Sequence, residues 1–92
     1  MTDAELKTKN RALSPESLAI GYRNTKHWLQ QCEQLLEEEK REFARRPDLY
    51  QAFASGTINQ IADLRRELAA YEREFHRRGL PLAAREISPQ AA

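Results

Sequence analysis

The stretch EFARRPDLYQAFASGTINQI, residues 42–61, contains two chain-breaking signals, and the fold depends on which of them reverses the chain. Pro47 inside a helix would remove a hydrogen bond and clash with the preceding turn, at a cost of about 3 kcal/mol. Gly56 inside a helix costs only about 1 kcal/mol relative to alanine. We therefore predict that the chain reverses just before Pro47 and that Gly56 lies within the returning helix.

Apolar residues recur in alternating steps of four and three on both sides of Pro47, which is typical of a coiled-coil seam. The upstream series is Leu18, Tyr22, Leu29, Cys32, Leu36 and Phe43, and the downstream series is Tyr50, Ala54, Ile61, Leu64, Leu68, Tyr71 and Phe75. When the two helices are paired so that the numbers of two opposite residues add up to 93, the two series lie opposite each other. The pattern predicts an all-α fold, an antiparallel two-helix coiled-coil hairpin of about 14–46 and 47–78.

The ends of the predicted helices carry capping signals. Ser14 can cap a free backbone N–H, and Pro15 suits the first helical position. Gly79 suits the left-handed position that ends many helices. These signals divide the chain into an N-terminal arm, 1–13, that is flexible or a short helix, a helical hairpin, 14–78, and an irregular C-terminal tail, 79–92.

One alternative for the second helix remains open at this stage. Thr57 and Gln60 have the spacing of a capping box, so the helix could break at 55–57 and leave 48–54 as a separate short helix. Such a break would change only the layers next to the turn. There Glu39 is expected to be a solvated residue opposite the small side chain of Ala54.

Composition limits the function classes. The 92 residues contain no valine, and Leu, Ala, Glu, Arg and Gln dominate, as in long helices. The formal net charge of +1 gives no strong attraction to nucleic acid or to anionic membranes. No apolar run is long enough for a membrane span or a signal peptide, and a single cysteine excludes an internal disulfide. We expect a cytoplasmic protein.

Large apolar residues beside the seam predict an interaction surface. The pairing rule places Leu35 next to Ile58 with Trp28 nearby, and Phe53 lies off the seam elsewhere. We expect these four residues to form an interface through which two hairpins pair into a four-helix bundle. The alternatives are that the tails fold over this surface, or that another protein binds it with Trp28 as the anchor.

The residues that could act in catalysis or bind a metal are not expected to lie close together. We therefore expect neither an enzyme, nor a cofactor, nor a metal site. His27 and His76 fall at different levels of the rod, and no zinc or di-iron spacing occurs. Cys32 belongs to the seam, where a thiol packs as a small apolar group. The glycines are isolated, which excludes a phosphate-binding loop.

Basic residues gather toward the end of the hairpin that is away from the turn. Arg73, Arg77 and Arg78 are the candidate phosphate contacts, but acidic residues are interleaved with them. Nucleic acid is therefore a partner that is considered but not favoured. The expected function is a non-enzymatic homodimeric adaptor or regulator that binds another protein. The alternatives are a nucleic-acid-binding regulator or a small inhibitor or chaperone of one specific protein, whose identity the sequence does not reveal.

Overall fold

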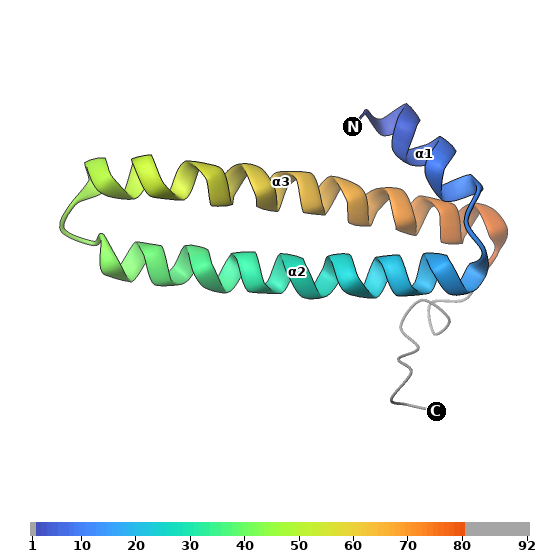
Figure 1. The fold of residues 1–92 in the computed structure, drawn as a ribbon, viewed down its shortest axis with the longest axis horizontal. Helices are drawn as coiled ribbons and strands as arrows, with labels where there is room; N and C mark the ends of the chain where they lie inside the picture. The colour runs from blue at the N-terminus through green and yellow to red at the C-terminus, as the bar shows by residue number, and fades with distance from the viewer. Residues whose placement is uncertain (1, 81–92) are drawn as a thin grey trace, which may run out of the picture.

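The protein is all-helical, and the predicted class is confirmed. A computed structural model describes residues 2–80, which form three packed helices: α1 (Asp3–Arg11), α2 (Pro15–Glu42) and α3 (Pro47–Arg78). Figure 1 shows α2 and α3 side by side and antiparallel, with α1 folded back against α3 at the end away from the turn. The predicted C-terminal tail lies outside the described residues except at Gly79 and Leu80.

The chain reverses between Glu42 and Pro47. Pro47 is the first residue of α3, as predicted, but α2 ends at Glu42 instead of near residue 46. A residue that precedes proline is kept out of the helical region by the proline ring. Arg46 accordingly has φ −134° and ψ 72°, so the helix must stop earlier and the connection needs residues 43–46.

α3 runs through Gly56 without a break, so the alternative with a new helix start at 55–57 is wrong. Thr57 does not use its hydroxyl as a cap. Its Oγ1 donates a hydrogen bond of 2.8 Å to Oε1 of Glu39 on α2. Glu39 is buried through this contact, and the expectation that it is solvated opposite Ala54 is also wrong. A carboxylate within reach of a hydroxyl donor on the facing helix can be withdrawn from water.

The other helix ends match their capping signals. The Ser14 side chain accepts a hydrogen bond from the Ser17 N–H at 3.1 Å, at the start of α2. Gly79 ends α3 with φ 67°, in the left-handed region that glycine tolerates best. Thr2 and Glu5 form a capping box at the start of α1. Each helix therefore begins or ends where a side chain or a glycine satisfies its free backbone groups.

Two clusters of buried residues hold α2 and α3 together. The cluster at the open end, away from the turn, contains Leu18, Tyr22, Tyr71 and Phe75, and the middle cluster contains Cys32, Ile61 and Leu64. These are seam residues, and the edge-on rings of Tyr22 and Phe75 have centroids 6.1 Å apart. The helices thus pack through the predicted seam. Among the described residues, no helix is both long enough and apolar enough to cross a membrane.

Candidate interaction surfaces

The pair of helices α2 and α3 exposes two broad faces, one on each side of the seam. The first, the charged face, is lined by Glu33, Glu37, Lys40, Ile58 and Arg65. Arg65 and Glu33 form an ion pair of 3.3 Å between the two helices, and Lys40 pairs with Glu37 at the same distance along α2. Charges of both signs therefore alternate around Ile58, which is typical of a solvated helix surface.

The second, the neutral face, contains Asn24, Trp28, Leu35, Phe53 and Gln60. Asn24, Trp28 and Gln60 line one shallow groove between α2 and α3. Leu35 follows Trp28 by seven residues and Phe53 precedes Gln60 by seven, so each lies on the same side of its helix as that groove. None of these five side chains is charged, although Lys9 and Glu67 also line the groove.

The structure separates residues that the sequence analysis placed together. Ile58 lies on the charged face, whereas Trp28 lies on the neutral face, so the expected contact between Leu35 and Ile58 is wrong. When two helices pack antiparallel, the residues just before the seam positions lie on the same side of the pair in both helices. The rule that facing numbers sum to 93 paired flanking residues from opposite sides. It also fails next to the turn, where Glu39 accepts a hydrogen bond from Thr57 and Phe43 stacks on Phe53.

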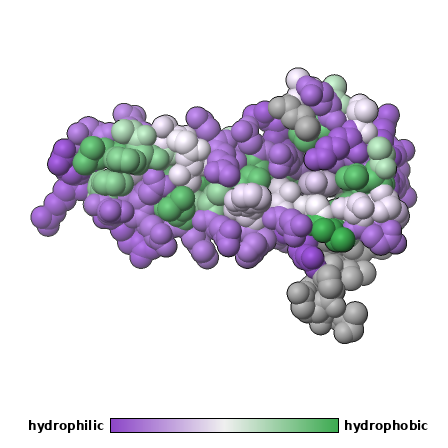
Figure 2. All heavy atoms as spheres, viewed as in Figure 1, coloured by the Kyte–Doolittle hydropathy of each residue, from purple (hydrophilic) through white to green (hydrophobic). Residues whose placement is uncertain are grey.

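Large apolar side chains are exposed on the neutral face. Trp28 is 57%, Leu35 48% and Phe53 60% exposed, although the ring of Phe53 stacks on Phe43 with centroids 5.3 Å apart. Figure 2 shows hydrophobic surface over the turn half of α2 and α3, and again nearer the middle of the rod. Large contiguous apolar patches on soluble proteins mark interaction sites, and these three side chains are spread along one side of the rod.

A buried carboxylate anchors α1 to α3. Glu74 is only 3% exposed, and its Oε2 lies 2.6 Å from Nη2 of Arg77 and 2.6 Å from Nε of Arg78. The hydrogen bond from Arg77, with the one from Arg78, lowers the pKa of Glu74 from 4.5 to about 2 against the opposing effect of burial. The carboxylate is therefore ionised at neutral pH.

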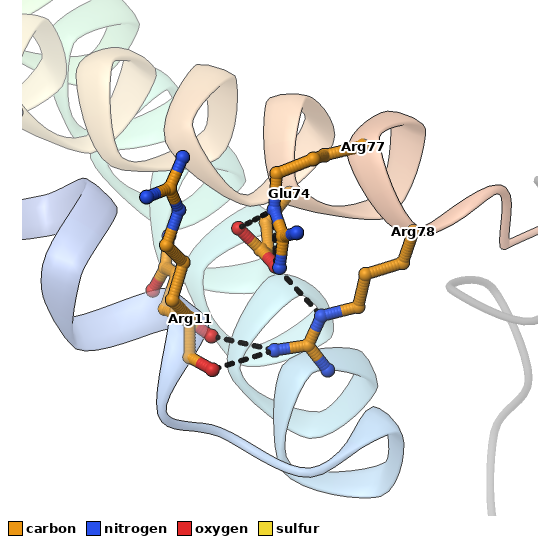
Figure 3. A network of polar contacts seen from close by, with 5 residues as sticks. Arg11, Glu74, Arg77 and Arg78 are labelled. Carbon is orange, nitrogen blue, oxygen red and sulfur yellow. Dashed lines mark hydrogen bonds and ion pairs between the residues drawn. The ribbon is translucent and has the colours of Figure 1, made fainter.

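Arg78 links this carboxylate to α1. Its Nη2 donates to the backbone carbonyls of Asn10, at 3.0 Å, and Arg11, at 3.2 Å, which are the last residues of α1. Figure 3 shows the Arg78 guanidinium between Glu74 and these carbonyls. A cation at the negative end of the helix dipole stabilises α1 in this position. Arg78 thus has a structural contact in addition to the phosphate contact expected for it.

Four basic side chains line a groove of about 690 Å³ between α1 and α3, which we call the basic groove: Lys7, Arg11, Arg73 and Arg77. The carboxylates Glu72 and Glu74 also line it. Two of the candidate phosphate contacts, Arg73 and Arg77, therefore lie together, and α1 adds Lys7 and Arg11, which the sequence also places toward the open end. In Figure 3 the Arg11 side chain extends from the end of α1 toward α3.

The candidate catalytic groups are not brought together. His27 is exposed on α2, His76 is exposed near the end of α3, and Cys32 is buried in the middle cluster. Within residues 2–80, the His, Cys, Asp and Glu side chains form no group of three that could hold a metal ion.

Sequence reasoning missed Glu74 and Asn10, which are the polar residues buried between α1 and α3. Asn10 is 2% exposed, and its side-chain amide nitrogen has no hydrogen-bond partner in the described part of the chain. The spacing of Glu74 from Arg77 and Arg78 allows ion pairs along a helix, but such spacing usually marks an exposed pair. In the structure Glu74 is buried while Arg77 stays half exposed.

Comparisons of sequence and fold find no matching family model, no matching curated protein and no matching solved structure for this chain.

Proposed function

We propose that the protein is a non-enzymatic interaction module, a helical hairpin braced by α1, that acts as a homodimeric adaptor or regulator in the cytoplasm. The observation that carries this proposal is the neutral face, where Trp28, Leu35 and Phe53 are about half exposed or more and where Lys9 and Glu67 are the charged residues that line the groove. On the charged face, by contrast, Ile58 is surrounded by ion-paired side chains. A partner that covers the neutral face would bury three large apolar side chains.

A second copy of the chain fits this face through a two-fold axis. Trp28 lies beside Gln60 and Glu67, so it is displaced along the rod from Phe53 by roughly 18 Å, at 1.5 Å rise per residue. An axis midway between them, near Leu35, would bring Trp28 of one chain against Phe53 of its partner, and the reverse. Pairing of two hairpins in this way gives an antiparallel four-helix bundle.

The size of the chain also supports self-association. Two long helices cover only one stripe of each other, and α1 spans nine residues at one end. A chain of 92 residues in an elongated form buries little apolar surface on its own. A dimer would roughly double the number of helices that surround each apolar side chain of the neutral face.

The test compares substitutions on the two faces. The variant Trp28→Glu/Leu35→Glu places charges on the neutral face, and the control Ile58→Glu places one on the charged face at a residue that is 46% exposed. Light scattering and analytical ultracentrifugation should give a dimer for the wild type and for the control. The neutral-face variant should be a helical monomer by the same measurements and by circular dichroism.

Two results would contradict the proposal. One is a wild-type chain that is monomeric at high micromolar concentration. The other is a dimer that Ile58→Glu dissociates and Trp28→Glu/Leu35→Glu does not.

A further inference from the structure

We propose that the basic groove binds a polyphosphate chain, as it occurs in tripolyphosphate and in nucleoside triphosphates. This inference goes beyond the proposed dimer, because the groove lies between α1 and α3 at the open end and involves none of Trp28, Leu35 and Phe53.

The cations form two short rows on different helices. Lys7 and Arg11 are four residues apart on α1, and Arg73 and Arg77 are four residues apart on α3, so each pair lies on one side of its helix. Like charges at this spacing destabilise a helix by a few tenths of a kcal/mol. An anion held between the two rows would offset this repulsion in both helices at once.

Most of these cations have no carboxylate partner. In the described range 2–80, no ion pair joins Lys7, Arg11 or Arg73 to an acidic side chain, whereas Arg77 is paired with Glu74. Three of the four basic groups in the groove therefore remain available to a ligand. Lys and Arg side chains are the usual contacts of phosphate oxygens, Arg through paired N–H donors.

The two carboxylates do not cancel the charge of the groove. Glu74 is already neutralised by Arg77 and Arg78, which leaves that trio with one net positive charge. The charged side chains that line the groove are four cations and the two carboxylates, so the groove has a net charge of +2. A carboxylate would neutralise only half of this charge, whereas a phosphate chain carries enough negative charge to neutralise all of it and is long enough to contact both rows.

The size of the groove agrees with this class of ligand. Its volume of about 690 Å³ lies within the range of small-molecule sites, roughly 300–1,000 Å³. A ligand that contacts both rows would connect α1 to α3 beside the contact that Arg78 already makes with the end of α1. Binding should therefore stabilise the docked position of α1 and raise the temperature of unfolding.

The experiment measures binding of tripolyphosphate to the full chain by calorimetry and by the shift in unfolding temperature. We expect saturable binding at low ionic strength that weakens with added salt. The variants Lys7→Gln and Arg73→Gln, one on each helix, should each weaken it about tenfold or more, since a charged hydrogen bond contributes about 1.5–3 kcal/mol. Arg66→Gln is the matched control, because Arg66 is an exposed arginine of α3 that pairs with Asp63 outside the groove.

Further ligands distinguish the sources of the phosphate chain. Adenosine triphosphate that binds as tightly as tripolyphosphate would identify the phosphate chain as the recognised group, and tighter binding would add a contact to the nucleoside. The proposal is overturned if tripolyphosphate does not bind at low ionic strength. It is also overturned if Arg66→Gln weakens binding as much as Arg73→Gln, or if a single-stranded oligonucleotide binds at the groove and tripolyphosphate does not.

Discussion

The two ends of the rod formed by α2 and α3 differ in what covers them. At the open end Leu18 is fully buried and Phe75 is 1% exposed, and α1 packs beside them on α3. At the turn end Phe53 is 60% exposed although it stacks on Phe43. Leu18 and Phe75 are seam residues, whereas Phe53 lies beside the seam. The seam residue Ala54 next to it is fully buried, so the difference arises because nothing in the described part of the chain covers the flank at the turn end.

This difference separates folding from association. Residues at the open end are buried within one chain, so their packing should determine the stability of the monomer. The exposed apolar residues at the turn end add little to the monomer, and under the proposed function they are buried by a second copy. Substitutions at the two ends should therefore affect different measurements.

The largest expected effect comes from truncating the ring at the open end. Phe75→Ala should lower the free energy of unfolding by about 3–5 kcal/mol, the usual cost of removing a buried aromatic ring. Phe53→Ala, at chain concentrations where the protein is monomeric, should lower it by about 0.5 kcal/mol or less, as for other exposed positions. Urea denaturation followed by circular dichroism measures both values.

A milder variant keeps this comparison measurable if Phe75→Ala does not fold. Phe75→Leu retains most of the apolar volume and should cost about 1 kcal/mol. Equal losses from Phe75→Leu and Phe53→Ala in the monomer would contradict the distinction between the two ends.

The second effect concerns the contact between α1 and α3 and its dependence on pH. The pKa of Glu74 falls from 4.5 to about 2 in the folded protein, so its ionised form stabilises the fold above pH 4.5. This contribution should decrease as the pH falls from about 5 to 2, by about 2 kcal/mol in total. The full pKa difference would give roughly 3 kcal/mol, but Arg77 is half exposed and water screens its charge.

The variant Glu74→Gln isolates this contribution. Its unfolding free energy should be lower than that of the wild type at pH 7 and should lack the corresponding decrease toward pH 2. Amide exchange of α1 should accelerate, because Arg78 loses the carboxylate that orients it. Asp63→Asn, which removes an exposed pair with Arg66, should change stability by less than about 0.5 kcal/mol. A wild-type pH profile that matches that of Glu74→Gln would exclude this role.

Much of the fold could be predicted from local signals in the sequence. The cost of proline within a helix placed the start of α3 at Pro47, and Ser14 and Gly79 marked helix ends by their capping chemistry. The buried seam residues of the two clusters followed from the spacing of apolar residues, which repeats regardless of Gly56. Each of these features depends on residues close together in the chain.

The features that could not be predicted depend on how the helices are rotated and on α1. Which face carries Ile58 depends on how α2 and α3 are rotated about their axes relative to each other. Pairing residues by their numbers alone does not determine this rotation. Glu74 is bonded to Arg78, which also contacts the end of α1, and α1 contributes only Leu6 and Asn10 as buried residues. Too little of its sequence is apolar to indicate this position.

The smallest expected effects come from two glycines inside helices, one toward the open end of the rod and one toward the turn end. A Cβ added to Gly21 would lie 2.5 Å from Oη of Tyr71 in the open-end core, whereas a Cβ added to Gly56 would meet no atom within 4 Å. Gly21→Ala should therefore lower the unfolding free energy of the monomer by about 1 kcal/mol, since overpacking exceeds the gain in helix propensity. Gly56→Ala should raise it by about 1 kcal/mol.

Gly56→Ala also tests how closely a second chain approaches α3. Urea denaturation at low chain concentration gives the monomer values, and ultracentrifugation at high concentration gives the strength of association. Gly56 lies four residues before Gln60 and three after Phe53, so it borders the neutral face. Weaker association of Gly56→Ala, together with a more stable monomer, would place the partner's backbone close to this residue. Unchanged association would place the contact nearer to α2, around Trp28 and Leu35. A loss of monomer stability in Gly56→Ala would contradict the open surface at the turn end, because a methyl group there should remain in solvent.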